Sequence, residues 1–334
     1  MKANMVFPSL AFTLFLTGLP SYSYAHHPPS TSRPTNKVST TSVGESTHVH
    51  LSYQLALYAS TKKNADTTDN LSLGKIIHHG FSLDGSLVLS SKTFFNAQIP
   101  YSYIRILPPE NSLGESTVEV SGIGDASFNL GQRLNLAIDK ERALFFIPSL
   151  GIRLANGSYQ SQPVLSKTDV SAGEGGQLDI ETFYTNASLG SGAIEILGRI
   201  EVGMELTSDL KTSLSQSWVL PVTKTEDGIL WGIDISSSLR GDWFLVKKVF
   251  AIGLSFEHLW HLADTIDTPQ DPKKESYSSG SRHQLSLATD ASIFVTPSIN
   301  CSLGASLPLY QNVDGLQLVE TINAKAGCGF AFAF

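Results

Sequence analysis

Charged side chains recur at every second position of several segments, between apolar neighbours. In an extended chain such side chains share one face, so they would line the inside of a closed sheet while their apolar neighbours face outward. The residues concerned, acidic and basic in nearly equal number, are Asp84, Arg133, Arg153, Glu195, Arg199, Glu201, Asp234, Arg240, Glu257, Asp290 and Lys325. Two interpretations stay open. The charges pair and fill a narrow lumen, or they form a transverse field that selects among permeants.

Histidines are the other candidates for chemistry, because membrane barrel hydrolases use a Ser–His pair or acidic residues with a His. His48 and His50 are expected to point inward on the first strand, whereas an interfacial lipase needs its nucleophile on the lipid side. The other candidates, His258 and His261, are followed by Asp264 and Asp267. The spacing of these four residues is generic and singles out no nucleophile. The sequence therefore predicts a protein that is not an enzyme.

Metal sites are not predicted either. His78 and His79 lack a third and a fourth ligand at zinc spacing. His26 and His27 would begin the mature chain, where an N-terminal His can chelate copper, but a solvated tail is the simpler interpretation. We expect no metal and no cofactor.

The two cysteines, Cys301 and Cys328, fall on the last two predicted strands. If the turn at 312–315 is the centre of a hairpin, they lie nearly opposite each other on the outward face. A cross-strand disulfide and two free lipid-facing thiols both stay open, because disulfides persist in an oxidising compartment but cross-strand geometry is tight.

Composition and the first residues indicate export. Of 334 residues only 16% are charged, against about 25% in soluble proteins, and the net charge of −7 leaves no basic surface for nucleic acid. Residues 1–25 have Lys2, an apolar core and small residues before Ala25, which is the layout of a cleaved signal peptide. The alternative, a membrane anchor, needs about 20 apolar residues, more than Pro8 and Pro20 enclose. Residues 26–46, rich in Pro, Ser and Thr, are expected to be a disordered leader.

From residue 47 to residue 334 the apolar residues alternate with polar ones, which predicts about 12 strands. Their expected ranges are 47–59, 77–89, 93–105, 124–137, 142–154, 178–189, 194–206, 229–243, 249–261, 283–294, 298–309 and 317–334. Short connections (90–92, 138–142, 190–193, 245–248, 296–298) take turns with long polar ones (60–76, 106–123, 155–177, 207–228, 262–282). Short periplasmic turns and long outer loops are typical of an outer-membrane barrel, with both chain ends on the periplasmic side.

The fold class expected for residues 47–334 is therefore all-β, a transmembrane antiparallel up-and-down barrel. A secreted β-sandwich also alternates, but the inward residues here are too polar for a sandwich core. Aromatic residues at strand ends are expected to form the interfacial girdles; they are Tyr53, Tyr58, Tyr101, Tyr103, Trp243, Trp260 and Tyr310. The chain ends in GCGFAFAF, with Phe330, Phe332 and Phe334 on one face, which is the signal that barrel-assembly machinery recognises.

Several segments resemble a family of outer-membrane transporters linked to phenol-degradation (MetA-pathway) gene clusters. They are QIPYSYI (98–104), GIGDASFNLGQRL (122–134), PSLGIRLANGSY (148–159) and SLPLYQNVDGLQLVE (306–320). The resemblance implies passage of small, often hydrophobic molecules. It is partial, since residues 154–157 stand where the family has a Pro-Thr-Gly-like turn. Gly122 and Gly124 suit a tight entry into a strand, and Asp125 is expected to bind local backbone amides.

The sequence thus predicts an outer-membrane channel for small, hydrophobic or aromatic solutes, with lipid, the assembly machinery and the permeant as partners. The alternative is a surface-exposed barrel with a plugged lumen that acts in adhesion or host interaction. Segment 207–228, with Trp218, Val219 and Leu220, is the candidate for a constricting loop.

Overall fold

The computed structural model describes residues 47–60, 75–107, 117–138, 143–157, 189–225, 229–246, 249–266, 277–279, 281–296, 298–313 and 318–332. Its strands are β1 (Thr47–Ser60), β2 (Lys75–Val88), β3 (Thr93–Leu107), β4 (Val118–Ile123), β5 (Ser127–Gln132), β6 (Leu134–Ala137), β7 (Ala143–Arg153), β8 (Glu195–Thr207), β9 (Leu210–Pro221), β10 (Ile229–Leu230), β11 (Asp234–Val246), β12 (Phe250–His261), β13 (Asp264–Ile266), β14 (Tyr277–Ser279), β15 (Arg282–Thr296), β16 (Ile299–Val313) and β17 (Leu318–Phe332). In these ranges, no helix has the length and apolar character needed to cross a membrane.

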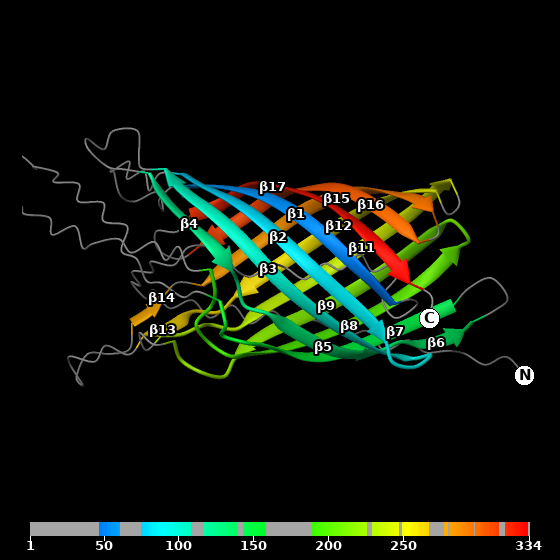
Figure 1. Cartoon of the computed structure of the whole chain (residues 1–334), viewed down its shortest axis with the longest axis horizontal. Helices are drawn as coiled ribbons and strands as arrows, with labels where there is room; N and C mark the ends of the chain where they lie inside the picture. Colours follow the sequence, from blue (N-terminus) through cyan, green and yellow to red (C-terminus); the bar gives the residue numbers. More distant parts are fainter. Residues whose placement is uncertain are drawn as a thin grey trace, which may run out of the picture.

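The strands close into one antiparallel barrel (Figure 1). Each wall strand pairs with the strands before and after it, and β1 completes the ring by pairing with β17 from Thr47–Phe332 to Ser60–Leu318. The main sheet counts 14 strands, but β4, β5 and β6 follow one another along a single line of the wall, so the barrel has 12 wall strands. β10, β13 and β14 form a separate three-stranded sheet. The predicted all-β barrel is confirmed.

The two faces of the wall differ sharply in polarity. On β12, Ile252, Leu254 and Phe256 point outward and are exposed, whereas Ala251 and Ser255 point inward and are buried. The same alternation runs through the other long strands, because successive side chains of a strand point to opposite faces. An apolar outer surface around a polar interior is the pattern of a barrel that faces lipid.

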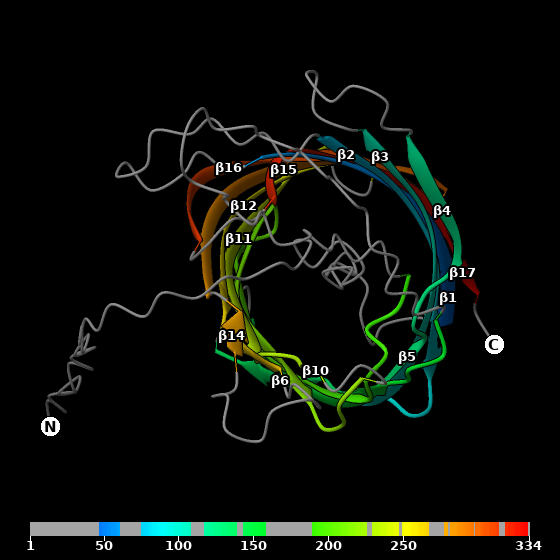
Figure 2. The same ribbon diagram turned by 90° about the vertical axis from the view of Figure 1, so that its left-hand side faces the viewer.

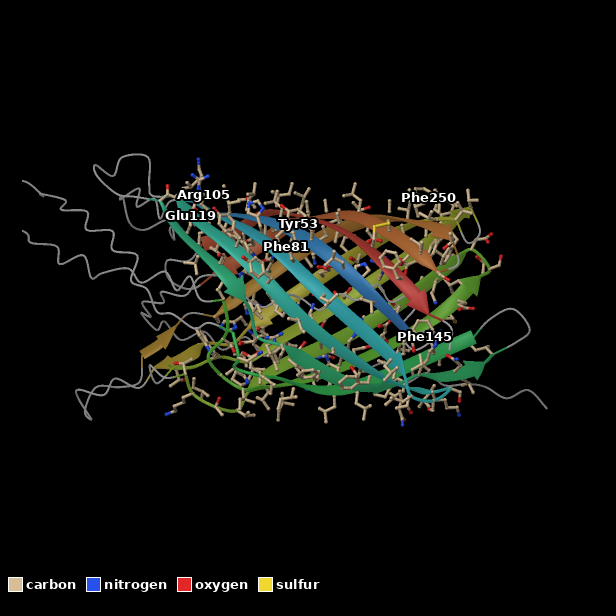
Figure 3. All side chains as sticks on the ribbon, viewed as in Figure 1. Tyr53, Phe81, Arg105, Glu119, Phe145 and Phe250 are labelled. Carbon is tan, nitrogen blue, oxygen red and sulfur yellow. A yellow bond between two sulfur atoms is a disulfide. The ribbon has the colours of Figure 1, made fainter. Side chains whose placement is uncertain are left out.

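Aromatic side chains recur on the outer surface of the barrel. Figure 3 shows Tyr53 and Phe81 in the middle of β1 and β2, and Phe250 near the end with the tight turns. The other girdle residues predicted from the sequence also take outward positions, except Tyr58. Tyr58 has the same strand parity as Ala56, so its side chain faces inward, where it is buried.

One predicted loop is a strand. Segment 207–228 contains the two-residue turn Ser208–Asp209 and then β9, which pairs with β8 and β11 in the wall. The predicted constricting loop is therefore wrong: Trp218 and Leu220 face outward, and Val219 is a wall residue. The outward Thr212 and Gln216 interrupt the apolar pattern of this strand and conceal it in the sequence.

The structure also bears on the predictions for three other segments, 178–189, 190–193 and 106–123. The strand expected at 178–189 lies outside the described residues except for Leu189, which is not in a strand. Residues 190–193, expected to form a periplasmic turn, instead follow this residue into the barrel. Segment 106–123, expected to be a loop, includes the end of β3 and all of β4. The turns that do join strands tightly, such as 208–209 between β8 and β9, lie at the end toward which β17 runs (Figure 1).

Candidate functional site

The candidate site is the inward face of the wall. All but one of the charged residues singled out in the sequence take inward register positions. The exception, Arg133, lies between β5 and β6 and is buried. Arg153 on β7 and Glu195 on β8 are opposite each other and form an ion pair of 2.5 Å. Four residues further along β8, the Arg199 guanidinium contacts Glu201 at 2.8 Å. Each charge of these two pairs therefore has an opposite charge as its partner, which compensates for the loss of hydration.

Arg240 is the centre of a second network. It reaches across β12 from β11 to β15, where it donates to both oxygens of Asp290 at 2.7 and 3.0 Å, and it also donates to Asp242. Gly253 lies beneath this bridge, and a Cβ atom there would be 2.3 Å from an Arg240 nitrogen. The absence of a side chain at residue 253 therefore leaves room for the bridge.

Histidines extend the charged lining. The Nδ1 atom of His261 lies 2.5 Å from Asp234, and His50 lies 3.8 Å from Asp84. Asp234 precedes His261 by 27 residues and reaches it only through the pairing of β11 with β12, so spacing along the chain does not reveal this partner.

The remaining members of the predicted set have different surroundings. Glu257 accepts a hydrogen bond from Ser255 at 3.0 Å. Arg133 lies 5.0 Å above the ring of Phe145 and donates to Asn135. Lys325 stands opposite Gly304 in the register of β16 and β17.

Two apolar clusters on the inward face were missed, because inward positions were expected to be polar. Near the end with the long connections, Leu189 packs with residues of β1, β2 and β3, namely Ala56, Tyr58, Ile76 and Ile104. Toward the other end, Phe94, Phe145 and Ile147 pack together, and Lys211 lies 5.3 Å from the Phe145 ring. All of these apolar residues are buried, so apolar packing fills part of the interior at two levels on its β1–β7 side.

Asp125 joins three parts of the chain that are distant in sequence. Its side chain accepts hydrogen bonds from the backbone N–H of Gly157 at 2.7 Å and of Ser191 at 2.5 Å, and from the Ser191 hydroxyl at 2.8 Å. It binds backbone amides, as the sequence suggested, but those amides are not local.

The histidines considered for catalysis are dispersed. His258 faces outward and is exposed, while His261 faces inward on the same strand. The ring of His78 contacts the Ser102 hydroxyl inside the barrel, and His79 contacts the Tyr53 hydroxyl outside it. The side chain of Asp264 and the whole of Asp267 lie outside the described residues. In the part of the chain that is described, no three His, Cys, Asp or Glu side chains converge as a metal site would require.

The outer face holds the other predicted features. Cys301 and Cys328 are cross-strand partners and form a disulfide, which resolves the alternative left open by the sequence. Phe330 is exposed on the outer face. The side chain of Phe332 and the whole of Phe334 lie outside the described part, so the assembly signal stays a prediction.

Comparison with protein-family models and with curated proteins gives no match. Among solved structures, an outer-membrane channel from Pseudomonas putida F1 is 13% identical and superposes with a TM-score of 0.64, covering 87% of this chain and 96% of that one. The β-domain of the Bordetella autotransporter Brka is 12% identical with a TM-score of 0.44, covering 86% and 99%. The NanC porin is 8% identical with a TM-score of 0.43, covering 86% and 100%. The first similarity shows a shared barrel fold, and the other two are too distant to support an argument.

Proposed function

We propose that this protein is an outer-membrane channel that passes small solutes and has no enzymatic activity. The observation that carries the proposal is the inversion of polarity across the wall, with exposed apolar side chains outside and hydrogen-bonding side chains inside. Lipid solvates the first face, whereas the second provides donors and acceptors to water and solutes.

The proposed permeant is an aromatic molecule that bears a polar group, and the interior through which it would pass combines apolar packing with polar lining. The cluster at Leu189 and Tyr58 and the cluster at Phe94 and Phe145 lie on the same side of the lumen, at its two ends. Between them the lining carries Ser82, Gln98 and other polar groups. The cluster residues are at most 5% exposed, so they shape the interior and do not themselves contact a permeant. The aromatic class of the permeant therefore rests on the resemblance to the transporters of phenol-degradation clusters.

Export and membrane insertion belong to the same proposal. A signal peptide over residues 1–25 and a leader over residues 26–46 would deliver the barrel, and the assembly machinery would recognise the terminal phenylalanines. The long connections on which adhesion would depend, such as 158–188, lie largely outside the described residues. No observation favours adhesion as a second function.

The test is single-channel conductance of the refolded mature protein in a planar bilayer, with two variants at adjacent positions of β11. Ser238 faces the lumen opposite Glu257, and Ser237 faces outward opposite His258. We expect steady conductance from the wild type, a clear reduction for Ser238→Trp, and no change for Ser237→Trp, because the second side chain points away from the lumen. Silence from folded, heat-modifiable wild-type protein would contradict the proposal.

A further inference from the structure

Residues Leu189–Ala193, here named the inner segment, lie inside the barrel. Leu189 is buried against inward side chains of β1, β2 and β3, and Ala193 has no exposed surface. Figure 2, which looks along the barrel, shows this green part of the chain within the ring, next to β5. The inner segment therefore occupies part of the cross-section through which a solute would pass.

The wall strand opposite the inner segment is interrupted where Asp125 stands. Residues 124–126 separate β4 from β5, and the interruption is held by hydrogen bonds from the Gly124 N–H to the Pro100 carbonyl and from the Ala126 N–H to the Asn156 side chain. Asp125 is itself buried, with 5% of its surface exposed. The Asp125 carboxylate is thus part of the wall. It accepts three hydrogen bonds, and two of them come from Ser191 of the inner segment.

Close packing and a second hydrogen bond complete the attachment. A Cβ atom on Gly190 would lie 2.5 Å from an Asp125 oxygen, and one on Gly124 would lie 2.7 Å from the Leu189 carbonyl oxygen. The Trp231 indole N–H donates to the Ser191 carbonyl at 2.6 Å. The inner segment is therefore attached through Ser191 to two separate parts of the barrel.

We propose that Asp125 is a specificity-determining residue of the channel, because it holds the inner segment inside the lumen and so sets the width of the passage there. This inference rests on the proposed channel function. A carboxylate accepts at both oxygens, whereas an Asn side chain presents an N–H₂ group at one of the two positions. Asp125→Asn would thus remove the charge of the acceptor and set a donor against the N–H of Gly157 or of Ser191, so the inner segment would be held less firmly and would leave the wall more often.

Release can be measured without transport. The chain has two cysteines, joined in the disulfide, so Cys introduced by Ala193→Cys would be the single free thiol. We expect slow maleimide labelling of the folded Ala193→Cys protein. Labelling of Asp125→Asn/Ala193→Cys should be about tenfold faster or more, since hydrogen bonds to a charged acceptor are among the stronger ones. The matched control is Asp84→Asn/Ala193→Cys, because Asp84 is an inward carboxylate whose contacts are with Ser82 and His50.

Conductance then tests the consequence for passage. We expect a higher single-channel conductance for Asp125→Asn than for the wild type. The conductance control is Asp209→Asn, in the exposed turn between β8 and β9, which should leave conductance unchanged. Equal labelling rates with and without Asp125→Asn would overturn the inference, as would faster labelling with unchanged conductance. If no variant conducts, the channel function fails, and the labelling still decides whether Asp125 anchors the inner segment. Should Asp125→Asn not fold, Ser191→Ala and Trp231→Phe each remove one donor and allow the same comparison.

Discussion

The guanidinium of Arg153 lies 2.5 Å from the carboxylate of Glu195 between β7 and β8, and the two residues are 4% and 0% exposed. Removing one partner of a buried pair leaves the other charge unsatisfied, which costs about 3–5 kcal/mol of unfolding free energy. We expect a loss of this size for Glu195→Gln and a smaller one for Arg153→Leu/Glu195→Leu. Urea unfolding in detergent, followed by heat-modifiable gel mobility, measures both.

The outer pair Arg105–Glu119 is the control for that experiment. Its charged groups lie 3.4 Å apart and are about half exposed, and Figure 3 shows them at the end with the long connections. An exposed pair contributes about 0–1 kcal/mol. A loss from Glu119→Gln as large as that from Glu195→Gln would show that burial does not determine the cost.

Arg199 offers a test of the charged lining as a selectivity device. Its side chain keeps 27% of its surface exposed, while its partner Glu201 keeps 3%. Arg199→Glu replaces a cation that lumen water can reach with an anion, so we expect a shift of the reversal potential toward cation preference in a salt gradient. An unchanged reversal potential would mean that the inward charges only pair with each other and fill the lumen.

The disulfide between Cys301 and Cys328 should stabilise the barrel. Cross-links of this kind typically contribute 2–4 kcal/mol, so we expect about that loss of unfolding free energy for Cys301→Ser/Cys328→Ser. The same measurement with and without reductant on wild-type protein should show an equal difference. Labelling of both thiols in unreduced, unfolded protein would contradict the bridge.

Adjacent positions of β11 test which face meets lipid. Leu239 is 56% exposed and faces outward, whereas Ser238 faces the lumen. A charge on the lipid face near the bilayer midplane costs about 2–4 kcal/mol. We therefore expect Leu239→Arg to destabilise the barrel by about that amount, and Ser238→Arg by much less. Equal losses, measured by urea unfolding in lipid vesicles, would contradict the assignment of the faces.

Much of the wall could be predicted from the sequence because a strand with one lipid face must alternate. On β12, Ile252, Leu254 and Phe256 show the pattern without interruption. β9 was missed because Thr212 and Gln216 take outward positions among its apolar residues, although Leu214, Trp218 and Leu220 keep the period. The alternation of apolar and polar residues therefore fails to predict a strand where polar side chains take outward positions.

The attachment of the inner segment could not be predicted in the same way. Asp125 and Ser191 are 66 residues apart. The tendency of Asp to bind nearby backbone amides does not predict which distant amide will lie next to it in the fold. Alternation predicts a strand that ends at Leu189, yet Leu189 is not in a strand and packs inside the barrel. Strand periodicity predicts which face of the sheet a side chain points to. It does not predict where the chain between two strands will fold.

The pairing of Thr47 with Phe332 also bears on how fast the protein can fold. Contacts between residues far apart in the chain form slowly, because the intervening segments lose entropy before the contact compensates for it. Every other contact between wall strands joins residues much closer in sequence, so the join of β1 and β17 has the greatest sequence separation in the barrel. We therefore expect ring closure to be the slowest step of insertion, and the step on which a catalyst of membrane folding would act.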